Sequence, residues 1–261
     1  MYTVRAIIQL TRVDSSVMGF LCLFIPVYAR TGDVGLSLGR AIPLLFICMC
    51  TFIANDLDDF ERDRINHPER PLPGHRLSPT VAAVLYFICL ALALFLTRRF
   101  VDQRMAFWYY ALVTVSISYG YVVECLPSIK APYVAAAISV PVFIVAASYP
   151  DEKRLYLVAV AGFLFGLGRE LCMDIDDRAA DVVSLLHRIR PTPIAIAAFI
   201  AQTVGLALLL VQVRRPLDII AGVFMALVLI LSGISWFSLK NHKAARRLMK
   251  LQILVGVYFL V

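Results

Sequence analysis

Residues 40–63 read RAIPLLFICMCTFIANDLDDFERD, an apolar run that ends in a dense group of carboxylates. A helix that crosses a membrane needs about 20 mostly apolar residues, so the first part of this stretch predicts a transmembrane span. Charged side chains beside a span are costly and are functional candidates by default. The stretch therefore predicts a membrane protein with a site at the end of this span.

The rest of the chain has a similarly apolar composition. Of its 261 residues, 61% are hydrophobic and 16% are charged, whereas soluble domains carry about 25% charged residues. The net charge of +7 would suggest nucleic acid in a soluble chain. Here the charges follow the loops, so we expect no nucleic-acid partner. The sequence predicts an all-α, polytopic membrane protein that forms one domain over residues 1–261.

Nine segments approach the length of a membrane span. The first is long and lacks a small-residue cleavage pattern, so we expect a retained helix and not a signal peptide. The predicted spans cover residues 6–29, 40–56, 80–97, 106–123, 131–149, 155–173, 192–213, 217–238 and 247–261.

The basic residues predict the orientation of these spans. With nine spans, one side of the membrane receives 16 of the 25 Lys and Arg residues. The positive-inside rule places that side in the cytoplasm. Both long acidic loops fall on the same side, so we expect an integral, multi-pass protein with its active-site loops in the cytoplasm.

Two acidic clusters carry the spacing of a helix face. Residues three or four apart lie on the same side of a helix, and both clusters repeat that spacing. Oxygen ligands of this kind suit Mg²⁺, which typically binds one or two carboxylates together with substrate phosphates. The spacing therefore predicts a Mg²⁺ site. Its expected ligands are Asn55, Asp59, Asp63, Asp174, Asp177 and Asp181.

Basic side chains accompany both clusters. An arginine fork can bind two phosphate oxygens at once, so these cations predict a site for a lipid-tailed diphosphate. The expected diphosphate-binding residues are Arg12, Arg62, Arg70, Lys130 and Arg178.

Other charged residues near the clusters have a simpler interpretation. Asp58 and Asp176 fall off the shared faces, and we expect them to be solvated. Arg246 and Arg247 are interpreted as topology signals.

The two motifs resemble a known family. Asn55-Asp56-x-x-Asp59-x-x-x-Asp63 is similar to the NDxxDxxxD signature of the UbiA superfamily of intramembrane prenyltransferases, and an Asn-x-x-x-Arg-Pro run follows in residues 66–71. The segment 174–181 resembles the second, DxxDxxxD-type signature of that superfamily. The resemblance implies nine helices around a central cavity with a cytoplasmic cap, Mg²⁺ as cofactor and an isoprenyl diphosphate as substrate.

The resemblance also implies roles for individual residues. Asp59, Asp63, Asp177 and Asp181 would be catalytic, as ligands of Mg²⁺ and the diphosphate. An apolar cavity would keep water from an allylic cation, and aromatic faces would stabilise it. The expected cavity aromatics are Phe52, Trp108, Tyr119, Tyr121 and Phe165.

Three functions remain open from the sequence. The first is Mg²⁺-dependent transfer of a prenyl group to an aromatic or lipid acceptor. The second is a UbiA-type terpene cyclase that needs no acceptor, since residues 179–193 lack the glycine usual in the family. The third is an ion-coupled transporter, which is disfavoured because transporters place such residues near the bilayer midplane.

Overall fold

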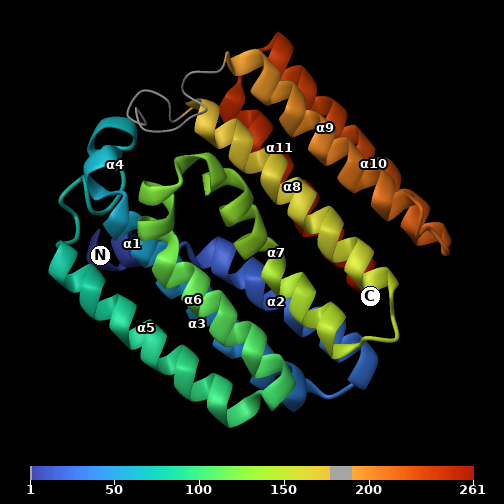
Figure 1. The fold of residues 1–261 in the computed structure, drawn as a ribbon, viewed down its shortest axis with the longest axis horizontal. Coiled ribbons are helices and arrows are strands. Elements are labelled where there is room, and N and C mark those ends of the chain that lie inside the picture. The colour runs from blue at the N-terminus through green and yellow to red at the C-terminus, as the bar shows by residue number, and fades with distance from the viewer. Residues whose placement is uncertain (1, 177–189) are drawn as a thin grey trace. The chain divides into compact units, whose positions relative to one another are not determined.

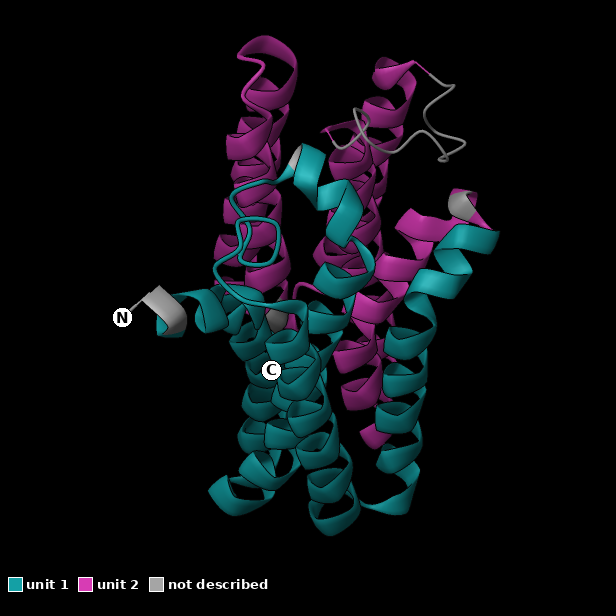
Figure 2. Ribbon diagram, turned by 90° about the vertical axis from the view of Figure 1, so that its left-hand side faces the viewer, with its two compact units in different colours: residues 1–125 teal, residues 126–261 magenta. Residues whose placement is uncertain are grey.

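The computed structural model describes residues 2–176 and 190–261, which form helices and turns with no strand among them. The chain divides into two compact units, residues 1–125 and 126–261, shown in teal and magenta in Figure 2. The first unit contains α1 (Tyr2–Leu10), α2 (Val13–Thr31), α3 (Val34–Asp58), α4 (Phe60–Asn66), α5 (Pro79–Phe100) and α6 (Gln103–Cys125). Figure 1 shows these helices in blue to green.

The second unit continues the chain in the same all-helical manner. It contains the short turn η1 (Pro127–Ile129), α7 (Lys130–Ser148), α8 (Arg154–Asp176), α9 (Pro191–Leu210), α10 (Pro216–Gly233), the π-helical turn η4 (Ile234–Ser238), α11 (His242–Gly256) and η5 (Val257–Leu260). Prolines occupy the first turns of α9 and α10, where their missing N–H costs no helical hydrogen bond.

Eight helices within the described residues are long and apolar enough to cross a membrane. They are α2, α3, α5 to α9, and α10 together with η4. The outward faces of α5 and α10 are rich in exposed apolar side chains such as Phe87 and Ile220, as expected for helices in contact with lipid. The chain is therefore an integral, multi-pass membrane protein.

The ninth predicted span differs from the others. The segment 247–261 forms most of α11 and η5, but α11 begins earlier, at His242, and has 15 residues. It is not among the helices with the length and hydropathy of a span. Its first turns carry Lys243, Arg246 and Arg247, and these charges shorten the apolar part of the helix.

The first predicted span is also broken. The prediction of one helix over 6–29 is wrong at Arg12, which adopts a left-handed backbone (φ 42°) between α1 and α2. The hydroxyl of Ser16 donates to the Thr11 carbonyl oxygen at 2.9 Å. The Arg12 guanidinium is bound by Asp56 on α3. These two interactions stabilise a conformation that costs a non-glycine residue about 1 to 2 kcal/mol.

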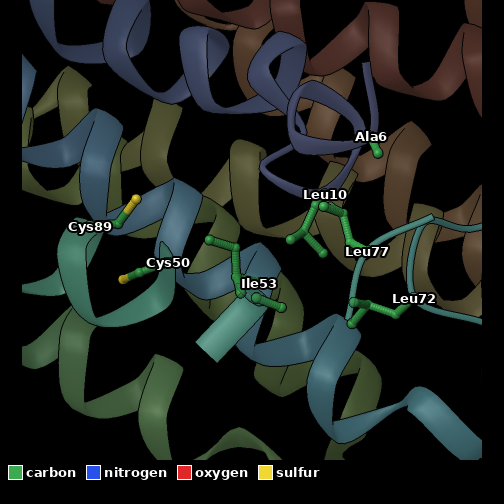
Figure 3. Close-up of a cluster of buried hydrophobic side chains, with 8 residues drawn as sticks. Ala6, Leu10, Cys50, Ile53, Leu72, Leu77 and Cys89 are labelled. Carbon is green, nitrogen blue, oxygen red and sulfur yellow. The ribbon is translucent and has the colours of Figure 1, made fainter. Parts of the chain in front are cut away.

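The loop after α4 is anchored to the first unit by apolar contacts. Leu72 and Leu77 of this loop are buried in one cluster with Leu10 of α1 and Ile53 of α3 (Figure 3). The Arg76 guanidinium donates to the Gln9 side-chain oxygen at 2.8 Å. Burial of each leucine stabilises this arrangement by about 1.5 to 3 kcal/mol. The loop therefore holds α1 beside the acidic end of α3.

Small residues allow α8 to approach its neighbours closely in the second unit. A Cβ atom added at Gly168 would lie 2.6 Å from the carbonyl oxygen of Ala198 on α9. One added at Gly166 would lie 3.3 Å from the Cα atom of Ala135 on α7. Such close approach is a usual basis of helix packing in membranes. It fixes α8, whose last turns carry part of the second acidic cluster.

Candidate diphosphate and metal site

The first acidic cluster keeps a helical register across the end of α3. The Asp59 N–H donates to the Asn55 carbonyl oxygen at 2.9 Å, and the Asp63 N–H donates to the Asp59 carbonyl oxygen at 2.8 Å. α3 ends at Asp58 and α4 begins at Phe60, yet the i to i+4 bonds continue between them. Asn55, Asp59 and Asp63 therefore follow one another at successive turns.

Two arginines bind the buried carboxylates of this cluster. Arg12 Nη2 lies 2.6 Å from Asp56 Oδ1. Arg70 Nη1 lies 2.6 Å from Asp63 Oδ2 and 3.7 Å from Asp56 Oδ1. Asp56 and Asp63 are only 3% and 4% exposed, so these cations offset the cost of burying both carboxylates. Asp56 is thus the residue that brings the two arginines together.

A third arginine and one aromatic ring complete the first half of the site. Arg62 Nη2 lies 2.8 Å from Asp59 Oδ1. The Arg12 guanidinium lies over the Phe52 ring, 5.0 Å from its centroid, a cation–π geometry. The structure therefore gathers three of the predicted diphosphate-binding residues and one predicted aromatic around the first cluster.

The environment of Asp63 disfavours an isolated negative charge. Burial raises the pKa of its carboxyl above the usual value, and the nearby Arg70 guanidinium partly offsets this rise. A carboxylate of this kind is stabilised in its ionised form by any further cation that approaches it. This is the electrostatic setting expected of a cation ligand.

The donor set of the first cluster fits Mg²⁺. The Asn55 side-chain oxygen is buried and has no hydrogen-bond partner among the described residues, and all the side-chain donors predicted here are oxygens. Within residues 2–176 and 190–261, no group of three or more His, Cys, Asp or Glu side chains is arranged to hold a metal ion. The predicted ligands Asp177 and Asp181, and the predicted diphosphate binder Arg178, lie outside the described residues.

In the second unit, α7 and α8 bring a lysine to the second cluster. Lys130, the first residue of α7, places Nζ 3.0 Å from Asp174 Oδ1. Asp174 lies in the last turn of α8 and is 6% exposed. The structure thus joins two residues that the sequence predicts for separate roles, one for the diphosphate and one for the metal.

Asp176 is not the solvated residue expected from the sequence. Its two carboxylate oxygens bind two residues of α11, His242 Nδ1 at 2.7 Å and Arg246 Nε at 3.2 Å. Arg246, which the sequence predicts as a topology signal, therefore also has a partner in the structure. The sequence indicated only that His242 and Arg246 share a helix face, because they are four residues apart. Their partner depends on the packing of α11 against α8.

The remaining predicted residues differ in exposure. Tyr119 and Phe165 are buried, Trp108 is half-buried, and Tyr121 is 74% exposed. Asp58 is exposed, as expected. A Cβ atom added at Gly120 of α6 would nevertheless lie 2.6 Å from Asp58 Oδ2, so this carboxylate packs against a helix surface.

Eight apolar helices with carboxylates and basic side chains at their ends define a polytopic membrane protein within the described residues. The sequence profile of the UbiA prenyltransferase family matches residues 18–255. The chain belongs to this family, and it is an enzyme of the prenyltransferase class. This membership decides against a role in transport alone.

Curated relatives support the same assignment. The digeranylgeranylglyceryl phosphate synthase of Thermococcus gammatolerans is 29% identical over 216 residues, which cover 78% of this chain and 75% of the relative. The enzyme of the same name from Methanopyrus kandleri is 28% identical over 244 residues, and these cover 86% of each chain. Both similarities extend over most of the chain.

Two solved structures have the same fold. A UbiA homologue from Aeropyrum pernix K1, in its apo form, has a TM-score of 0.78 at 17% identity and covers 94% of this chain and 96% of its own. A structure from work on digeranylgeranylglyceryl phosphate synthase in membranes has a TM-score of 0.65 at 19% identity, with 100% and 99% coverage. At these identities the similarity shows the all-helical membrane fold.

Proposed function

We propose that this enzyme catalyses Mg²⁺-dependent transfer of a prenyl group from an isoprenyl diphosphate to a lipid acceptor of the prenylated glyceryl phosphate class. The observation that carries the proposal is the pairing of Arg12 and Arg70 with Asp56 and Asp63. Asp56 follows Asn55 directly, and Asp63 lies two turns beyond it. The names of the curated relatives support the choice of acceptor.

The first cluster would hold the metal and part of the diphosphate. Asn55, Asp59 and Asp63 supply oxygen donors at successive turns. Their arginine partners balance the carboxylates in the structure. When a cation takes over that role, the guanidinium groups become available to phosphate oxygens, which they bind in a bidentate manner. The residues proposed to change partner in this way, from a carboxylate to the diphosphate, are Arg12, Arg62 and Arg70.

The second cluster carries a corresponding set of proposed ligands. Asp174, Asp177 and Asp181 are the proposed metal ligands, and Lys130 and Arg178 are the proposed partners of the diphosphate. Mg²⁺, when bound, would neutralise charge that develops on the leaving diphosphate. Lys130 forms a 3.0 Å ion pair with Asp174. Its positive charge would also stabilise the leaving diphosphate.

The chemistry is a substitution at the first carbon of the prenyl chain. The bond between that carbon and the diphosphate oxygen breaks, and its electron pair leaves with the diphosphate. The acceptor hydroxyl oxygen forms the new bond to carbon and gives up its proton. The apolar helices would exclude water from the reactive carbon. The basic residues beside both clusters favour a cytoplasmic location for this step.

Product analysis tests the proposal. Purified protein in detergent is incubated with Mg²⁺ and geranylgeranyl diphosphate, together with geranylgeranylglyceryl phosphate, a phenol or no acceptor. We expect diphosphate release and a doubly prenylated lipid with the glyceryl phosphate acceptor. A cyclic hydrocarbon formed without any acceptor would show a terpene cyclase instead. Prenylation of the phenol alone would overturn the choice of acceptor.

A further inference from the structure

Asp176 is joined to the start of α11 by both of its carboxylate oxygens. Oδ1 is hydrogen-bonded to His242 Nδ1 at 2.7 Å, and Oδ2 forms an ion pair with Arg246 Nε at 3.2 Å. His242 and Arg246 are four residues apart and therefore lie on one face of α11. Because both oxygens are engaged, Asp176 serves as an anchor in this arrangement, whereas Asp174, two residues earlier, binds Lys130.

The segment that carries His242 is itself fixed by local structure. The indole ring of Trp236 stacks on the His242 imidazole, with centroids 4.0 Å apart and planes at 12°. Trp236 is 5% exposed and lies in η4, a π-helical turn, a type of turn often found at functional sites. The Asn241 side-chain oxygen accepts from the Ala244 N–H at 3.0 Å and caps α11.

Apolar packing beside Asp176, His242 and Arg246 joins the end of α8 to the start of α11. Cys172 of α8 is fully buried in a cluster with Trp236, Ala245 and Met249. Asp176 is the last residue of α8, and the chain runs directly from it into Asp177.

We propose that Asp176, His242 and Arg246 are positioning residues, which hold the end of α8 so that Asp174 keeps the orientation needed to bind the metal and the diphosphate. The proposal rests on the function proposed above, because it assigns these residues to that same site. Partners that orient a metal ligand typically change metal affinity or activity by about 10- to 100-fold when removed. α11 would therefore contribute to catalysis without touching the substrate.

Variants of α11 test this role by the Mg²⁺ dependence of turnover. His242→Leu and Arg246→Gln should each raise the half-saturating Mg²⁺ concentration about 10-fold or more. His242→Asn keeps a side-chain N–H donor and should recover most of the wild-type value, which a role in packing alone would not predict. Arg247→Gln removes the same charge from an exposed position of α11 and is the matched control.

A second measurement is independent of turnover. The chain has two tryptophans, so Trp108→Phe leaves Trp236 as the sole reporter beside His242. Addition of Mg²⁺ with inorganic pyrophosphate should change the fluorescence of Trp236, and His242→Leu in the same background should abolish that response. Equal Mg²⁺ dependence in all the α11 variants, or an unaltered Trp236 response in His242→Leu, would overturn the inference. Absence of turnover in the wild type would count against the proposed function, while the fluorescence response still decides the inference.

Discussion

The ion pair between Arg12 and Asp56 should stabilise the first unit, because it closes the break between α1 and α2. Its atoms are 2.6 Å apart, and the Asp56 side chain is 4% exposed while that of Arg12 is 29% exposed. With an effective dielectric constant of about 20, the Coulomb attraction at this distance is ~6 kcal/mol. Solvent at Arg12 and the cost of desolvation reduce it, so we expect a net coupling of about 1.5 to 3 kcal/mol.

A double-mutant cycle measures this coupling. Arg12→Gln, Asp56→Asn and the double variant are compared by the free energy of unfolding in mixed detergent micelles. The matched control is the cycle for Arg64 and Glu61, whose atoms are 3.3 Å apart and whose side chains are 56% and 76% exposed. An exposed pair contributes less than about 1 kcal/mol.

The comparison of the two cycles decides the outcome. The reasoning predicts a clearly larger coupling for the Arg12–Asp56 pair than for the Arg64–Glu61 pair. A coupling for Arg12–Asp56 no larger than that of the exposed control would refute the claim that Asp56 fixes Arg12 and the helix break.

Three further predictions concern packing and the cofactor. Gly168→Ala places a Cβ 2.6 Å from the Ala198 carbonyl oxygen, so it should lower the free energy of unfolding by about 1 to 3 kcal/mol. Gly162→Ala on the same helix meets nothing nearer than 3.9 Å and should be neutral or stabilising by up to about 1 kcal/mol; equal losses in the two variants would contradict the close α8–α9 packing. Gly120→Ala meets only the exposed Asp58 side chain, which can rotate, so its thermal midpoint should fall less than that of Gly168→Ala. Removal of divalent cations with EDTA should stop diphosphate release, and added Mg²⁺ should restore it; release that persists in EDTA would exclude the proposed metal dependence.

Most of the membrane spans were predictable because the bilayer imposes their length and apolar character. The register of the first acidic cluster was also predictable, since residues four apart follow one another on any helix. The structure keeps that register from Asn55 to Asp63 even though α3 ends between them. Both features depend only on residues close together in the sequence.

Features that depend on distant residues were missed. The left-handed turn at Arg12 is stabilised by Asp56, 44 residues further along the chain. The anchoring of Asp176 requires α11 to pack against α8, and its residues are 66 positions apart. No local pattern of charge or hydropathy specifies such a pairing. The sequence therefore predicted which residues gather at the helix ends better than it predicted how they pair.

The central claim is that both acidic clusters serve one Mg²⁺-dependent prenyl transfer. The most direct measurement is the rate of prenylated lipid formation by the wild type, Asp63→Asn, Asp174→Asn and the exposed control Asp58→Asn, at saturating Mg²⁺ and with thermal midpoints recorded for each. We predict a loss of at least ~100-fold for Asp63→Asn and for Asp174→Asn, measured at a temperature at which the recorded midpoints show every variant folded, and near wild-type turnover for Asp58→Asn. Turnover close to wild type in either Asp63→Asn or Asp174→Asn would contradict the claim.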